Sequence, residues 1–162
     1  MSIMTGQLDL LVTAGAEMAQ AQSKDALLLV AARAARQLTG AAYSSIGFVE
    51  GEVIHWQSAA GKPIEEVRGY RMPISEGLCG WVVRNGRSRR SDDVTKEPDY
   101  FQQYAEMRSE LDVPIKAGEE VIGVLSCESP GIKAFTAEHQ ALLQVPAGYV
   151  AVAVAFRTSP LI

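Results

Sequence analysis

Apolar residues near both ends of the chain recur at helical spacing. Between residues 8 and 19, and again between 27 and 38, Leu, Val and Ala return every three or four positions, which predicts two successive helices or one interrupted helix. Ser23 is a suitable N-cap for the second of these helices, and Gly40 is a suitable residue to end it. Thr136 is expected to cap a last helix, which Pro146 should kink or open locally.

The middle of the chain has the pattern of β-strands. Residues 41–60 contain two apolar runs around a polar turn, which predicts a β-hairpin. A second hairpin is expected from residues 109–116 and 119–128, because apolar residues on both arms alternate or run together. Shorter strands are expected at residues 69–73 and 87–91.

Three shorter helices are expected between the two hairpins. One covers residues 64–68, one begins after Ser75 as N-cap and stops at Gly86, and one runs from Pro98 through Met107. Together these elements predict an α+β fold with a largely antiparallel sheet. The terminal helices would cover one face, and the segment 61–108 would seal the other and leave a small cavity there.

Composition narrows the class of protein. The chain has 162 residues, of which 48% are hydrophobic and 21% charged, so it can form one sizeable core. A net charge of -4 argues against a broad electrostatic contact with nucleic acid or an anionic membrane. The first ten residues lack the basic start and apolar run of a secretory signal, so we expect a cytoplasmic protein.

Two features of the sequence could suggest a membrane protein or a metal-binding protein. Residues 139–156 carry no Asp, Glu, Lys or Arg, but they include His, Gln, Pro and Gly, which favours a buried helix over a membrane span. Cys79 and Cys127 have neither a CxxC spacing nor an obvious His partner. We therefore expect two buried thiols and no zinc or other metal site.

Three stretches of the sequence resemble a known family. They are SEGLCGWVVRNGRSRRSDDVTKEPDY, RSELDVPIKAGEEVIGVLSCESP and AFTAEHQALL, and they resemble the GAF domain, a ligand-sensing module of signalling proteins. The resemblance implies a five- or six-stranded antiparallel sheet with terminal helices on one face and a ligand pocket on the other. It also implies one domain over residues 1–162, with a helical extension at 1–22 and a GAF core at 23–157, and a homodimer formed through the terminal helices.

Candidate ligand-binding residues follow from the resemblance and from side-chain chemistry. Gly77 lies near a helix N-terminus, where free N–H groups favour an anion or a carbonyl, although a simple turn is the alternative. Glu110 would hold an amine or a ring N–H, or else form an ion pair at the surface. Aromatic residues would line the cavity or simply pack in the core. The full set is Trp56, Glu76, Gly77, Cys79, Trp81, Tyr100, Tyr104, Glu110, Ser126 and Glu128.

One enzyme of the family gives an alternative reading. The free methionine-R-sulfoxide reductase resembles this chain at Glu110 and over residues 123–129, where Ser126 and Glu128 replace two aspartates of its pattern. Its reactive cysteines lie just before the strand at 109, and residues 92–108 contain no cysteine. Cys79 and Cys127 are therefore the catalytic residues that a thiol enzyme of this kind would need to use.

Other ligands of the family are disfavoured by the sequence. A covalent bilin is commonly attached to a Cys followed by His, but Gly80 and Glu128 follow the two cysteines. Haem would need His55 or His139 as an axial ligand, and a lone His is more often a hydrogen-bonded surface residue.

The leading expectation is a stand-alone bacterial GAF module in signal transduction. It would be non-enzymatic, bind a small molecule, form a homodimer and pass its signal to a separate output protein, because no kinase, cyclase, phosphodiesterase or DNA-binding segment is recognisable. A sulfoxide-reductase-like thiol enzyme and a ligand-free dimerisation scaffold remain the alternatives.

Overall fold

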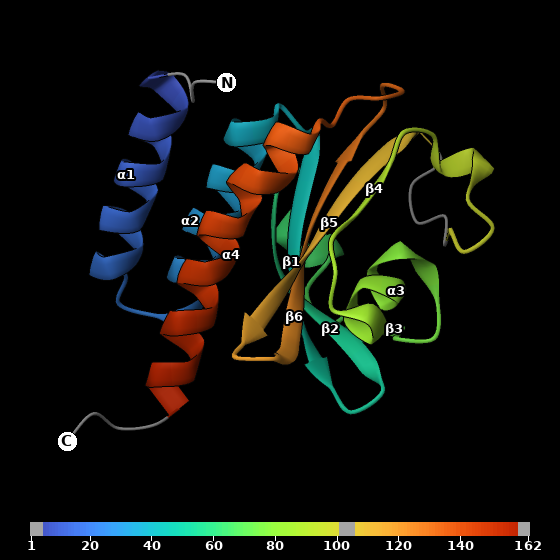
Figure 1. Ribbon diagram of the computed structural model, residues 1–162. Coiled ribbons are helices and arrows are strands. Elements are labelled where there is room, and N and C mark those ends of the chain that lie inside the picture. Colours follow the sequence, from blue (N-terminus) through green and yellow to red (C-terminus); the bar gives the residue numbers. More distant parts are fainter. Residues whose placement is uncertain (1–4, 101–105, 159–162) are drawn as a thin grey trace.

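A six-stranded antiparallel sheet forms the centre of the protein, with strand order β3-β2-β1-β6-β5-β4. The computed structural model describes residues 5–100 and 106–158. The strands are β1 (Tyr43–Glu50), β2 (Val53–Ala60), β3 (Arg71–Pro73), β4 (Arg89–Ser91), β5 (Ser109–Ala117) and β6 (Glu120–Ser129). The helices are α1 (Thr5–Gln20), α2 (Lys24–Thr39), α3 (Gly77–Asn85) and α4 (Ala137–Thr158), with single 3₁₀ turns at Ile64–Glu66 and Val94–Lys96. Figure 1 shows α1, α2 and α4 on one side of the sheet and α3 on the other.

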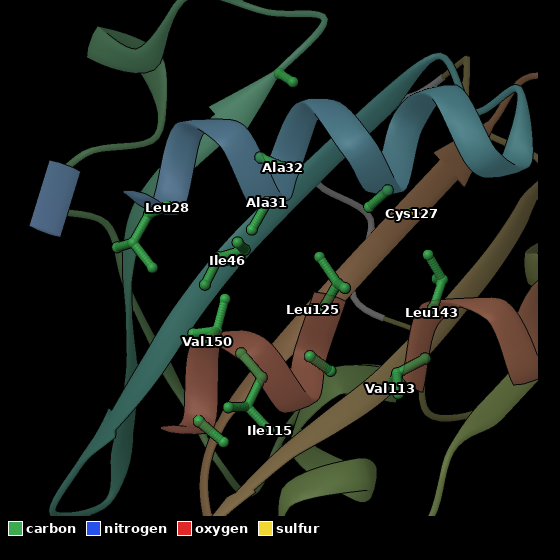
Figure 2. Packing of buried hydrophobic residues seen from close by; sticks show 14 of the residues in the cluster. Leu28, Ala31, Ala32, Ile46, Val113, Ile115, Leu125, Cys127, Leu143 and Val150 are labelled. Carbon is green, nitrogen blue, oxygen red and sulfur yellow. The ribbon is translucent and has the colours of Figure 1, made fainter. Parts of the chain in front are cut away.

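The main core lies between the sheet and the terminal helices. Successive side chains of a strand point to opposite faces, so Ile46 of β1 and Leu125 of β6 reach the helix layer. Figure 2 shows them between Leu28 of α2 and the α4 residues Leu143 and Val150. All five side chains are completely buried. This packing explains the helical spacing of apolar residues near both ends of the chain.

Several expected helix ends are confirmed. The Ser23 side chain accepts a hydrogen bond from the Ala26 N–H, and Gly40 ends α2 in the left-handed conformation at a φ of 70°. The Thr136 hydroxyl accepts a bond from the His139 N–H. Of the two alternatives for the first segment, the structure has two separate helices, and α4 continues through Pro146 as one helix.

Some expected elements differ from the structure. Ser75 does not cap α3, because the N-cap is Glu76, whose extended backbone precedes the helix without a side-chain bond. The helix expected at 64–68 is one 3₁₀ turn, and the strands expected at 69–73 and 87–91 contain only three residues each.

The helix expected from Pro98 to Met107 is not formed in its described part. Pro98, Asp99 and Tyr100 make a turn, and Met107 is not helical, while residues 101–105 lie outside the described residues. The turn is held by the Tyr100 N–H bonded to the Glu97 carbonyl and by an ion pair between Asp99 and Arg89.

The second face of the sheet carries a smaller apolar cluster. Ile54 and Trp56 of β2 pack there with Met72 of β3 and with Cys79 and Val82 of α3. This is the expected arrangement of a GAF-like α+β fold, with a covered second face. None of the helices in the described ranges is long and apolar enough to cross a membrane.

Candidate functional site

A small cavity of about 30 Å³ lies between α3 and the second face of the sheet. A space of this size holds about two water molecules. Its floor comes from β1, β5 and β6, and its walls come from β2, from α3 and from the segments beside them. The lining residues are Ser45, Trp56, Lys62, Val67, Met72, Gly77, Leu78, Cys79, Tyr100, Glu110, Ser126 and Glu128.

Strand register places the polar side chains of the floor. Glu110 of β5 lies directly opposite Glu128 of β6, and Asp112 of β5 lies opposite Ser126 of β6. Ser45 of β1 is the partner of Ser126 on its other side. Paired residues of neighbouring strands share a face of the sheet, so these five side chains form two adjacent polar rows under α3.

The floor is strongly acidic and poorly solvated. Glu110 is 6% exposed and Asp112 is 0% exposed. Burial raises the pKa of Glu110 well above its usual range, and the charge of Asp112 raises it further. Burial likewise raises the pKa of Asp112. Burial also raises the pKa of Glu128, to about 7, against the opposing effect of the Lys62 ammonium. Protons are therefore retained on this cluster at pH values where surface carboxyls are ionised.

Cys79 projects from α3 onto this floor. Its thiol donates a hydrogen bond to Glu110, with Sγ 3.7 Å from Oε1. Burial raises the pKa of Cys79, and the nearby carboxylates of Asp112 and Glu110 raise it further. The group is therefore a thiol and not a nucleophilic thiolate in this environment.

Cys127 lies on the opposite face of the sheet. It is completely buried in the core against the terminal helices, whereas Cys79 belongs to the cluster under α3. Figure 2 places Cys127 beside α2. Burial raises the pKa of this thiol too. Because the sheet separates the two sulfur atoms, they have no direct path to a disulfide in this fold.

The remaining polar groups of the cavity are donors. The Trp56 indole N–H is buried and has no hydrogen-bond partner among the described residues. Burial lowers the pKa of Lys62, while the charge of Glu128 raises it. The Lys62 ammonium also lies 5.0 Å from the centre of the Tyr43 ring. The cavity thus combines carboxyl acceptors with an indole donor and one ammonium.

The structure brings together seven of the ten residues expected at a ligand site. They are Trp56, Gly77, Cys79, Tyr100, Glu110, Ser126 and Glu128. Glu76 is exposed outside the cavity, and Tyr104 lies outside the described residues. Trp81 does not line the cavity, because its ring faces the guanidinium groups of Arg87 and Arg89, 5.7 and 5.1 Å from its centre.

The two glycines at the start of α3 have different roles. Gly77 begins the helix with a φ of 71°, a left-handed conformation that suits glycine, and it lines the cavity. At Gly80, an added Cβ would lie 2.5 Å from the Ile74 carbonyl oxygen, so the glycine permits close packing of α3. Since the floor facing Gly77 carries carboxyl groups, the cavity favours a cationic or hydrogen-donating ligand over an anion.

Sequence reasoning missed Asp112 and Lys62. Asp112 had a usable signal, because it follows Glu110 at the two-residue spacing that places side chains on one face of a strand. Lys62 had none, since it lies in the irregular segment after β2 and reaches the cavity only through the folded path of the chain.

Comparison with family models matches residues 21–155 to the GAF domain. The chain belongs to the GAF domain family. Its fold is that of a solved GAF domain from an Acinetobacter phosphoenolpyruvate-protein phosphotransferase, with a TM-score of 0.87 over 99% of both chains and 19% sequence identity. The identification of the family and of the α+β fold from the sequence is therefore confirmed.

Two curated relatives match the GAF chain over shorter stretches. Protein YtsP of Bacillus subtilis is 35% identical over 60 residues, which cover 37% of each protein. Free methionine-R-sulfoxide reductase of Escherichia coli is 30% identical over 70 residues, which cover 43% of this chain and 42% of the enzyme. The chain thus aligns with less than half the length of either relative.

Proposed function

We propose that this GAF domain is a non-enzymatic sensory module that binds a small organic molecule carrying an amine or another cationic group. The observation that carries the proposal is the pair of Glu110, which is buried, and Glu128, which is half-buried, on the floor of a cavity that is closed by aromatic side chains. A cationic group between two carboxylates would relieve their repulsion and replace the water that they lost on folding. Trp56 would supply an apolar wall and a free N–H donor.

The ligand would act by changing the order of the segments over the cavity. At about 30 Å³ the cavity is smaller than an amino acid, so binding requires α3 or the turn at Tyr100 to move outward. Because α3 packs on β5 and β6, whose other faces contact α4, such a movement would reach the terminal helices. A changed helix surface is what a separate output protein in signal transduction would read.

The proposal is tested by identifying and then weakening the ligand. Native mass spectrometry of the purified protein and a thermal-shift screen of amines and amino acids, including methionine sulfoxide, should find a binder. Calorimetry with that compound should then show at least tenfold weaker binding for Glu128→Gln and for Trp56→Phe. Glu120→Gln is the matched control, because this glutamate lies on the same strand at an exposed position. Equal affinity in all variants would reject this cavity as the binding site.

A thiol enzyme is the second candidate, favoured by the similarity to free methionine-R-sulfoxide reductase. Reduction of a sulfoxide by thiols needs an attacking thiolate and a second thiol that resolves the product. Cys79 is protonated beside Glu110, and Cys127 lies across the sheet, which argues against this chemistry. Turnover of free methionine-R-sulfoxide with a thiol reductant, lost in Cys79→Ser, would establish the enzyme and overturn the non-enzymatic proposal.

The helix layer supports the further proposal of a homodimer. Leu8 and Val12 of α1 are 52% and 65% exposed, and Tyr149 and Val152 of α4 are 41% and 57% exposed. The two helices pack on each other, so a second copy that docks on this layer would cover exposed apolar side chains from both. A ligand-free dimerisation scaffold is the third alternative, and the absence of any bound or screened ligand together with a stable dimer would favour it.

A further inference from the structure

Three potential metal ligands converge under α3, and two of them, Cys79 and Glu110, also line the cavity. Cys79 comes from α3, and Glu110 and Asp112 come from alternate positions of β5. One ligand atom from each residue lies within 4.8 Å of the others, and all three residues are buried. We propose that Cys79, Glu110 and Asp112 bind a thiophilic divalent cation of the zinc type.

The spacing of these atoms is close to that of a tetrahedral site. Zinc–sulfur and zinc–oxygen bonds of about 2.3 and 2.0 Å place a sulfur and an oxygen ligand roughly 3.5 Å apart. The observed separation of Cys79 Sγ and Glu110 Oε1 is 3.7 Å. The widest separation in the cluster is within 4.8 Å, so it has to shorten by roughly 1.5 Å at most. Rotation of a carboxyl group about its side-chain bonds covers such a distance.

Asp112 provides independent support for a missing positive group. It is completely buried, and neither carboxyl oxygen has a hydrogen-bond partner of good geometry in the described part of the chain. Its nearest polar neighbours are Glu110, Ser126 and Cys79. A buried carboxylate without a donor carries a large desolvation cost, which is removed by a proton or by a bound cation. This unpartnered group faces the other two ligands, as a metal site requires.

The cationic side chains near the three proposed metal ligands have other carboxylates as their main partners. Arg89 lies across from Asp112 on β4, but its guanidinium is bound to Glu97 at 2.8 Å and to Asp99 at 3.3 Å. Lys62 has Glu128 as its strongest charged neighbour. In the described part of the chain, the ion pairs of Arg89 go to Glu97 and Asp99 only, although its charge still lowers the pKa of Asp112 from a longer distance, against the larger effect of burial. The cluster therefore retains an excess of acidic groups that a divalent cation would neutralise.

The mixture of ligands selects the kind of metal. A thiolate excludes magnesium and calcium, which take six or more oxygen ligands, whereas zinc accepts both sulfur and carboxylate oxygen. Binding would release the thiol proton of Cys79 and any proton held by the two carboxyls to solvent. Three protein ligands leave one position open for water or another oxygen ligand, and the Ser126 hydroxyl, on the residue paired with Asp112, lines the same cavity.

The spacing of residues in the sequence does not indicate this metal site. Cys79 and Glu110 are 31 positions apart and belong to a helix and a strand. The site shares Glu110 with the proposed ligand cavity but depends on Cys79 and Asp112, whereas the organic ligand depends on Trp56 and Glu128. The two proposals can therefore fail separately.

The test is a metal titration of untagged, reduced protein after removal of metals with a chelator. Calorimetry with Zn²⁺ should show one cation per chain, and Co²⁺ should produce a thiolate-to-cobalt charge-transfer band. Cys79→Ser should abolish that band and weaken Zn²⁺ binding at least tenfold, and Asp112→Asn should also weaken it at least tenfold. Cys127→Ser is the matched control, because it removes the other buried thiol from the far face of the sheet and should change neither result.

Folding and the organic ligand are controlled in the same series. Circular dichroism and thermal melts of each metal-free variant show whether it folds, and Zn²⁺ should raise the Tm of the wild type and of Cys127→Ser by more than that of Cys79→Ser or Asp112→Asn. Trp56→Phe and Glu128→Gln should keep the Zn²⁺ affinity while losing the organic ligand. Absence of stoichiometric binding, or equal binding by Cys79→Ser and the wild type, would overturn the metal site. If Cys79→Ser does not fold, unchanged binding by Asp112→Asn would overturn it.

Discussion

Glu110 and Glu128 lie directly opposite each other on two central strands, under the cover of α3. Like charges at a paired position destabilise a sheet, and burial adds a desolvation cost to each carboxylate. The protein keeps this unfavourable pair on the floor of its cavity and not at its surface. Such a pair makes the stability of the fold sensitive to pH and to any cation that enters.

Stability is expected to fall between about pH 5 and pH 8. The pKa of Glu128 is raised from 4.5 to about 7, so the folded state holds a proton that the unfolded state has already released. The stabilisation is complete below the unfolded value and is lost as the pH rises through the folded value, by roughly 1–3 kcal/mol in total. Thermal melts of the ligand-free protein across this range measure the loss.

The Glu128→Gln variant should remove the share of this pH dependence that belongs to Glu128, because its amide does not titrate, while Glu110 and Asp112 keep theirs. Glu119→Gln, at an exposed turn position, serves as the control and should behave like the wild type. A Tm that rises from pH 5 to pH 8 in the wild type would contradict the assignment of a protonated cluster.

Asp112→Asn is expected to stabilise the metal-free protein. The amide has nearly the shape of the carboxyl group, carries no charge, and can donate a hydrogen bond to Glu110 or Ser126. We expect a gain of about 1 kcal/mol in the free energy of unfolding at pH 8, measured by urea denaturation. Asp92→Asn, at an exposed position, should have little effect. A loss of stability would show that Asp112 has a structural role as an anion.

Gly80→Ala should destabilise the protein by about 1–3 kcal/mol, because the new methyl group would press on the Ile74 carbonyl and push α3 from the sheet. Gly148→Ala in α4 is the contrasting variant, since outside its own helical turn no described atom lies within 4 Å of the added Cβ. Helix propensity predicts a gain of up to about 1 kcal/mol there. Denaturant unfolding of both variants compares the two effects, and equal changes would refute the close packing at Gly80.

Charged substitutions in the helix layer should separate the proposed dimer. Val12→Glu and Val152→Glu place a carboxylate in the exposed apolar surface of α1 and α4, and burying it against a second copy would be costly. Analytical ultracentrifugation should show at least a tenfold weaker association for each. Ile132→Glu is the control, because this residue is 50% exposed and lies beside Arg90 and Asp92, near β4. A monomeric wild type would reject the dimer.

Much of the fold could be predicted because its signals are local. The spacing of Leu and Ala in α2, the cap at Ser23 and the stop at Gly40 lie within a few residues of one another. The two long hairpins could also be predicted from the sequence, since the two strands of each hairpin follow each other in the chain. The short elements between them were not, because a three-residue strand such as β3 depends on pairing with β2 more than on its own composition.

The residues of the candidate site likewise include some that the sequence indicated and some that only the folded structure placed. Glu110, Ser126 and Glu128 were recognisable from the strands that carry them, as were Trp56 and Gly77 from their residue types. Trp81 was expected at the cavity, but its ring faces Arg87 and Arg89, and this orientation depends on tertiary contacts that the sequence does not indicate.

The chain alone therefore establishes the family, the order of the long elements and the polar character of β5 and β6, because these depend on side-chain periodicity and on short-range motifs. Only the folded structure decides which polar groups meet. The register of β5 with β6 places Glu110 against Glu128, and the packing of α3 brings Cys79 to Glu110 and Asp112, while Cys127 goes to the opposite face. Contacts between distant segments are set by strand pairing and core packing, which neighbouring residues in the sequence do not encode.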